Sequence, residues 1–120
     1  MTIGQRVRVH FNLHTYLWSV TAMDGPDRGR VIAHQSECAL IRCKFIVSEA
    51  GRQRVLRNRC RLVHAWVEGF VTPLDEPLDA AEFSYNPYRD STFTRRDTGA
   101  ALHTASRVWF IGCRALVSTD

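Results

Sequence analysis

Lysine is nearly absent from this sequence, and long apolar runs are missing. Fifteen of the sixteen basic residues are arginine, and Lys44 is the only lysine. No apolar stretch approaches the roughly 18 residues that span a bilayer. The first residues, MTIGQRVRVHF, alternate charged and apolar side chains, whereas a secretory signal needs an unbroken apolar core. We therefore expect a soluble protein of the cytoplasm.

Metal-binding and catalytic motifs are also missing. The four cysteines form no CxxC pair, and Cys60 with His64 has no second pair of comparable spacing. Cys38 and Cys43 lie an odd number of positions apart in a strand-like run, which predicts opposite faces. The sequence has no GxSxG, P-loop, HExxH or dinucleotide-binding glycine motif, and its five histidines are scattered. We expect free thiols, no metal, no cofactor and no catalysis.

The length and patterning predict one domain, residues 1–120, of the α+β class. With 45% apolar residues the chain can fill a core. Residues 6–11 and 16–22 alternate as in a strand hairpin, and MDGPDRG at 23–29 is rich in turn formers. Further strands are expected at 30–34 and 38–47. In the latter run we expect Arg42 and Lys44 outside and five core residues: Ala39, Ile41, Cys43, Phe45 and Val47.

One helix is expected at about residues 49–59, with Ser48 as its N-cap and Glu49 in the first turn. Gly51 inside this helix costs about 1 kcal/mol relative to alanine, which indicates that something approaches the backbone there. Five arginines fall at positions 52, 54, 57, 59 and 61, with no acidic residue between Glu49 and Glu68. Arginines without acidic partners repel one another unless an anion offsets them.

The remaining chain is expected to return to strands. Residues 62–71 alternate, with Val63 and Val67 opposite His64 and Glu68, and both faces are expected to be buried; 72–82 form an acidic loop. RDTG at 96–99 predicts a tight turn between two short strands, and 106–112 and 114–117 are the closing strands. The expected fold is an antiparallel β-sheet with one main α-helix packed on it.

An aromatic loop, SYNPYRDSTF at 84–93, combines rings with one amide and one guanidinium. These are the parts of a pocket that stacks a base and reads its edge. The same residues are equally compatible with a proline-shaped turn whose rings pin it to the sheet.

Several blocks together resemble a known family. FNLHTYLWSV, FIVSEAGRQRVLR, VHAWVEG, SYNPYRDSTF and RDTGAALHTASRVWF, in that order, are similar to the phage-encoded Thoeris anti-defence proteins of the first family. The resemblance implies a sponge that binds cyclic ADP-ribose isomers, glycocyclic ADP-ribose among them, without cleaving them. It also implies capture of cyclic di- or trinucleotides of CBASS defence in separate sites, assembly as a dimer or hexamer, and action in the cytoplasm of the infected bacterial host.

Residues carried over with the resemblance form two sets. For the cyclic ADP-ribose pocket they are Tyr85, Asn86, Tyr88 and Phe93, with Arg107 reaching a phosphate. For cyclic oligonucleotide phosphates they are Arg52, Arg54 and Arg57. Trp66 and Trp109 are assigned instead to the core or to a contact between subunits.

Two other functions stay open. A basic helix and exposed aromatics also suit a module that binds RNA or single-stranded DNA, whose binding would weaken steeply with salt. A small nuclease or cyclic-nucleotide phosphodiesterase would turn its ligand over and would lose activity with a histidine. A sponge would return its ligand unchanged.

Overall fold

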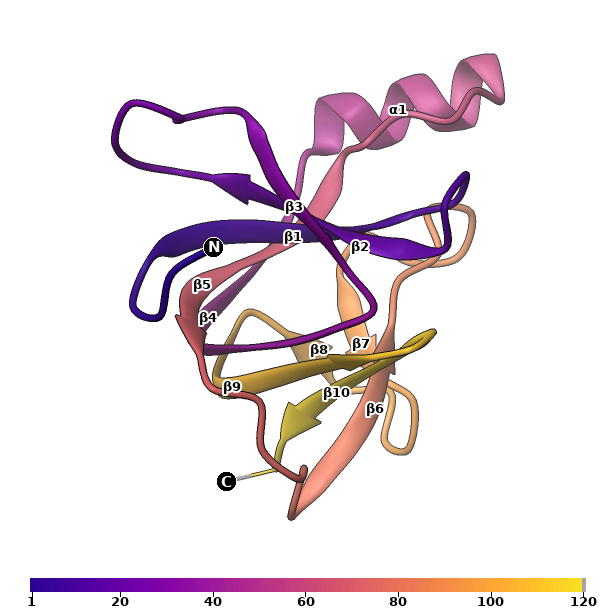
Figure 1. Ribbon diagram of the computed structural model, residues 1–120. Helices are drawn as coiled ribbons and strands as arrows, with labels where there is room; N and C mark the ends of the chain where they lie inside the picture. Colours follow the sequence, from indigo (N-terminus) through magenta and orange to yellow (C-terminus); the bar gives the residue numbers. More distant parts are fainter. Residues whose placement is uncertain (120) are drawn as a thin grey trace.

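The structure, a computed structural model, describes residues 1–119 and contains one sheet and one helix (Figure 1). The first five elements are β1 (Arg6–Asn12), β2 (Leu17–Ala22), β3 (Val31–Gln35), β4 (Glu37–Val47) and α1 (Glu49–Asn58). They are followed by β5 (Ala65–Thr72), β6 (Ala80–Ser84), β7 (Phe93–Arg95), β8 (Ala101–Leu102), β9 (Thr104–Ile111) and β10 (Arg114–Ser118). Among the described residues no helix is long and apolar enough to cross a membrane.

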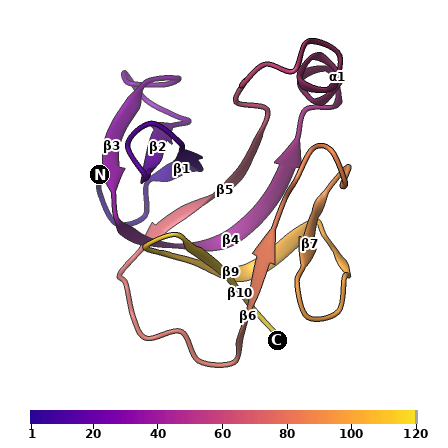
Figure 2. The same cartoon turned by 90° about the vertical axis from the view of Figure 1, so that its right-hand side faces the viewer.

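The strands follow the order β3-β2-β1-β5-β4-β9-β10-β6-β7-β8, and each neighbouring pair is antiparallel. The predicted hairpin is present, with Val7 opposite Ala22 and Asn12 opposite Leu17. The sheet bends strongly, so that β1–β3 form one arm of a trough and β6–β7 form the other (Figure 2). The expected antiparallel sheet with one helix is therefore confirmed.

The two faces of the sheet are covered differently. The inner face of the trough carries the main core, where Val9, Leu40 and Phe110 are almost fully buried. The outer face carries a smaller cluster of Ala39, Trp109 and Leu116. Alternate side chains of β4 and β9 pack in the two clusters, because successive side chains of a strand point to opposite faces.

A β-bulge in β4 corrects two predictions. The register shifts between Ile41 and Lys44, and Arg42 has a φ of 54°. One extra residue inverts the alternation, so Cys38 and Cys43 lie on the same face, in the main core. The prediction that these thiols point to opposite faces is wrong. Ala39 is buried as predicted, but in the outer cluster and not on the face of Cys43, and Ile41 belongs to neither cluster.

The helix begins and ends almost as predicted. Ser48 is the N-cap, and its hydroxyl accepts a hydrogen bond from the Gly51 amide at 3.3 Å. The helix ends at Asn58 because Arg59 adopts the left-handed conformation, with φ 50°. It buries only Gly51 and Val55 and extends along the rim of the trough (Figures 1 and 2). A Cβ at position 51 would lie 2.5 Å from the Cβ of His64, which explains the glycine.

The segment at 60–64, between α1 and β5, is irregular and corrects a third prediction. β5 begins at Ala65 rather than near residue 62. Val63 is 55% exposed, whereas His64 is buried. The expectation that both faces are buried is therefore wrong for Val63, which lies before the strand begins, whereas the backbone carbonyl of His64 accepts from the Ser48 amide at 2.7 Å. The predicted RDTG turn is confirmed, since it joins β7 to β8 with Gly99 at φ 75°.

Candidate functional site

The trough encloses a cleft of about 640 Å³ between its two arms. One wall is the end of the β1–β2 hairpin, and the opposite wall is β6 with the loop that follows it. Segment 60–64 and the β9–β10 turn complete the lining. This volume lies within the range of pockets for small ligands, roughly 300–1,000 Å³.

Aromatic rings line much of the cleft. Phe11 and Trp18 meet edge to face with centroids 4.8 Å apart, and the Phe110 ring follows at 4.4 Å from Trp18. On the other wall, the rings of Tyr85 and Phe93 lie 5.3 Å apart. The Trp18 Nε1 donates to the Gly112 carbonyl at 2.8 Å, so its polar edge is already satisfied. The cleft therefore offers apolar ring surface on both sides.

A partly buried polar pair interrupts this apolar lining. The Tyr85 hydroxyl lies 2.8 Å from the Nε2 of His64, and the Nδ1 of His64 lies 2.8 Å from the Leu62 carbonyl oxygen. Both side chains line the cleft. Burial raises the pKa of Tyr85, so its phenol remains protonated at neutral pH and can act as a hydrogen-bonding group.

Basic side chains lie at the mouth of the cleft. Arg61 comes from the segment after α1, while Arg96 and Arg114 lie on the opposite side and share the Glu82 carboxylate. Arg114 Nε donates to Glu82 at 2.7 Å, and the Arg96 guanidinium lies 3.4 Å from it. One carboxylate offsets only one of two guanidinium charges. The mouth is thus net positive and suits an anionic group.

Histidines add polar groups to the hairpin side of the cleft. His10 and His14 line it, and burial, the positive charge of Arg8 and the nearby His34 lower the pKa of His10. His10 is consequently neutral at physiological pH. Within residues 1–119, no group of three or more histidine, cysteine or acidic side chains is arranged to hold a metal ion.

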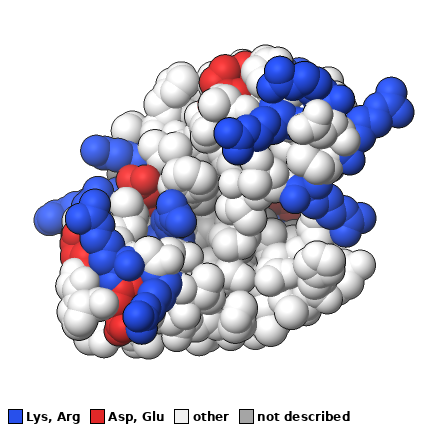
Figure 3. Space-filling model, turned by 90° about the horizontal axis from the view of Figure 1, so that it is seen from above, with Lys and Arg blue, Asp and Glu red and all other residues white. Residues whose placement is uncertain are grey.

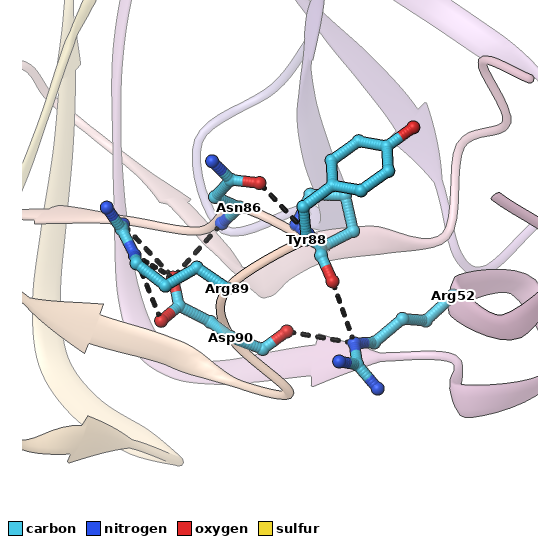
Figure 4. Close-up of polar contacts among 6 residues, drawn as sticks. Arg52, Asn86, Tyr88, Arg89 and Asp90 are labelled. Carbon is cyan, nitrogen blue, oxygen red and sulfur yellow. Dashed lines mark hydrogen bonds and ion pairs between the residues drawn. The ribbon is translucent and has the colours of Figure 1, made fainter. Parts of the chain in front are cut away.

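The loop at 86–92 is held by its own polar groups and by the helix (Figure 4). The Asn86 side-chain oxygen accepts from the Tyr88 amide at 3.0 Å, and Asp90 accepts from the Asn86 amide at 3.2 Å. Arg52 reaches across from α1, and its Nε donates to the carbonyls of Pro87 at 3.2 Å and Asp90 at 2.9 Å. The side-chain amide of Asn86 thus stabilises the turn, a role that asparagine often has.

The structure brings only part of the predicted pocket together. Tyr85 and Phe93 line the cleft, whereas Asn86 and Tyr88 belong to the adjacent loop, where Tyr88 is 62% exposed. Arg107 lies on the outer face of β9, where it pairs with Asp75 and donates to Thr72. The two-residue period of β9 turns Val108 and Phe110 inward instead. Arg107 is therefore separated from the cleft, which corrects its grouping with the pocket.

The helix arginines also divide into two groups. Arg52 is engaged with the loop and with Glu49. Arg54 and Arg57 are exposed, and neither forms an ion pair within residues 1–119. Seen from above, basic side chains gather over the end that bears α1, and a second group mixed with acidic residues lies across a mostly uncharged hollow (Figure 3). Arg54 and Arg57 remain exposed cations outside the cleft lining.

The two tryptophans assigned to core or subunit contacts lie in different settings. Trp109 is buried in the outer cluster, and its Nε1 donates to Asp75 at 2.9 Å. Trp66 is only half-buried and lies under the Arg8 guanidinium, 4.7 Å from the ring centroid. Trp109 is therefore a core residue, as predicted.

Other lining residues were missed by sequence reasoning. Phe11 and Trp18 follow the regular alternation of the hairpin strands and look like ordinary core positions. Arg61, Arg96 and Arg114 are far apart in the chain. The bend of the sheet brings them to one opening. A single sequence carries no local signal for that bend, so these residues become visible only in the fold.

Fold and cleft together define a small antiparallel β protein of one domain, with a cavity of ligand size between the arms of a bent sheet. The chain belongs to the family of the Mycobacterium phage L5 gene 82 protein, whose family model matches residues 1–118. It is 35% identical to that phage's gene 82 protein over 111 residues, which cover 87% of this chain and 88% of the relative. No solved structure matches the chain. The protein is thus a member of a phage protein family.

Proposed function

We propose that this phage protein is a binding protein that captures a small nucleotide in the cleft and holds it unchanged. The observation that carries the proposal is the combination of lining groups in one cavity. Ring surface from Phe11 and Tyr85 faces the space where a base would stack, and Arg61 and Arg114 lie at the mouth where phosphates would sit.

The ligand class that we propose is a cyclic ADP-ribose isomer. Its base, two riboses and pyrophosphate would combine stacking with charge, as the lining does. The resemblance to Thoeris anti-defence proteins suggests this ligand and suggests sequestration inside the infected bacterial cell, where a captured signal no longer reaches its effector. Sequestration requires tight binding and no reacting group.

A second, weaker site for cyclic di- or trinucleotides belongs to the same proposal. Arg54 and Arg57 are exposed and lack ion-pair partners among residues 1–119, so an anion can approach them. Arg52 is less suited, because its Nε already donates to two loop carbonyls. The same exposed arginines also favour the alternative, binding of RNA or single-stranded DNA outside the cleft.

A depletion and recovery assay tests the proposal. The purified chain is incubated with a cyclic ADP-ribose isomer, with a cyclic trinucleotide, or with an oligonucleotide, and is then filtered. The retained protein is heated, and the released compound is identified by chromatography and mass spectrometry. We expect the cyclic ADP-ribose isomer to be depleted from the filtrate and recovered intact. A changed product would indicate an enzyme, and retention of the oligonucleotide alone would favour the nucleic-acid alternative.

Paired variants locate the binding. Arg61→Gln should weaken binding of the cyclic ADP-ribose isomer about tenfold, since one charge-assisted hydrogen bond is lost. Arg28→Gln is the matched control, because Arg28 is an exposed arginine of the β2–β3 loop. Arg57→Gln should leave this ligand unaffected and reduce retention of the cyclic trinucleotide. Equal effects of Arg61→Gln and Arg28→Gln would contradict binding in the cleft.

A further inference from the structure

The hydrogen bond between Tyr85 and His64 has a direction that the surrounding groups determine. The Leu62 carbonyl oxygen can only accept, so the His64 Nδ1, 2.8 Å away, must carry a proton. In a neutral imidazole the other ring nitrogen is then an acceptor. The Tyr85 hydroxyl therefore donates its one hydrogen to the His64 Nε2, across 2.8 Å.

This direction leaves the Tyr85 oxygen as an acceptor. A phenolic hydroxyl has one hydrogen to donate and lone pairs that accept. Its hydrogen is used by His64, and no other hydrogen bond to the Tyr85 oxygen occurs within residues 1–119. Both residues line the cleft, so a ligand bound there meets the Tyr85 oxygen as a hydrogen-bond acceptor and not as a donor.

The position of His64 is fixed from several sides. Its carbonyl accepts from the Ser48 amide at 2.7 Å, at the residue that caps α1. Its Cβ lies where a side chain at position 51 would begin, and only glycine leaves that space. Its ring packs edge to face on Tyr85, with centroids 5.4 Å apart. The imidazole therefore has little freedom to turn and reverse the hydrogen bond.

We infer that Tyr85 is a specificity-determining residue that accepts a hydrogen bond from a donor on the ligand's base, and that His64 is the positioning residue that fixes this polarity. The preferred ligand is then one with an amino group, as in adenine, and a base with a carbonyl at the same position is disfavoured. Two facing acceptors would leave both without a partner, which costs binding. The inference rests on the proposed function, because it concerns the nucleotide in that cleft.

A matched ligand pair tests the inference. The probes are a cyclic ADP-ribose isomer whose 6-amino group is free and the inosine analogue of the same isomer, in which a carbonyl replaces the amino group. Calorimetric titration of the full chain at pH 8 should show about tenfold weaker binding of the inosine compound. Equal affinities would overturn the inference and leave the proposed function intact. Failure of both compounds to bind would overturn both.

Variants of Tyr85 and His64 distinguish the direction of their hydrogen bond from a purely structural role. Tyr85→Phe keeps the ring and removes the acceptor, so the two ligands should bind within about twofold of each other. Tyr88→Phe is the control, because Tyr88 is exposed outside the cleft lining, and it should retain the full preference. His64→Phe releases the Tyr85 hydrogen to the ligand, so the preference should shift toward the carbonyl compound. A loss of affinity without any shift in preference would indicate that His64 is merely structural.

A spectroscopic measurement tests the polarity without any ligand. In protein labelled with ¹⁵N-histidine, the His64 ring should show a protonated Nδ1 and an unprotonated Nε2 at pH 8. A protonated Nε2 would overturn the inference, because the Tyr85 oxygen would then be the acceptor for His64 itself.

Discussion

Replacing Gly51 by alanine tests the contact that positions His64. Alanine at an exposed position inside a helix is favoured over glycine by about 1 kcal/mol. At position 51, however, the new Cβ would lie 2.5 Å from the His64 Cβ. Neither Cβ lies at the end of a flexible side chain, so the helix α1 or the segment 60–64 must move. Such overpacking destabilises a protein by about 1–3 kcal/mol. Because the contact is so close, we expect the overpacking cost of Gly51→Ala to be about 3 kcal/mol.

The balance of these two terms is a loss of about 2 kcal/mol in the free energy of unfolding. With a urea m-value of about 2 kcal/mol/M, the midpoint should fall by about 1 M at unchanged slope. Arg54→Ala and Arg54→Gly provide the matched control, because Arg54 is exposed in the same helix; there alanine should be the more stable. If Gly51→Ala also raised the midpoint, the close approach of helix and His64 would be refuted.

Three further predictions follow from other contacts. Arg52→Gln should speed amide hydrogen exchange at Arg89 and Asp90 about tenfold, since the loop loses the bonds from Arg52 to two carbonyls, whereas Arg54→Gln should not change it. The hydrogen bond from the Trp109 indole N–H, and then the positive charge of Arg107, lower the pKa of Asp75. The ionised Asp75 therefore stabilises the fold at pH values above the ordinary carboxyl pKa. This stabilisation is lost as the pH falls through the lowered pKa of Asp75 in the folded protein. Acid unfolding of Asp75→Asn should accordingly show a shallower pH dependence there, and an unchanged dependence would contradict the pairing. Burial raises the pKa of Cys38 and of Cys43 to about 12. A thiol reagent at pH 8 should therefore modify only the exposed Cys60 and Cys113 in the native protein, and all four thiols in urea. Rapid labelling of Cys43 in the native protein would refute its burial.

Local chemistry explains why several elements could be predicted from the sequence. The Ser48 cap and the RDTG turn each depend on residues within a few positions, and each is present in the structure. The cap accepts its hydrogen bond within its own turn, and Gly99 takes the left-handed conformation that glycine tolerates. Such features need no knowledge of the rest of the fold.

The bulge and the cleft could not be predicted in this way. Arg42 takes a positive φ inside a long apolar run, and this single residue reverses which side chains of β4 face the core. The bend of the sheet places Phe11 and Tyr85 in one cavity although they are distant in sequence. Conversely, Arg107 is grouped with Tyr85 and Phe93 in the predicted site, but it lies on the outer face of β9. Register and curvature are long-range properties, so a local pattern does not determine them.

The location of binding is the central claim, and a nuclear magnetic resonance titration tests it most directly. ¹⁵N-labelled protein is titrated with a cyclic ADP-ribose isomer that has a free 6-amino group. We predict saturable shifts at amides around the cleft, at Phe11, Ala65, Tyr85 and Arg114, and none at Arg107 on the outer face. Shifts confined to α1, or no shifts at millimolar ligand, would contradict the claim.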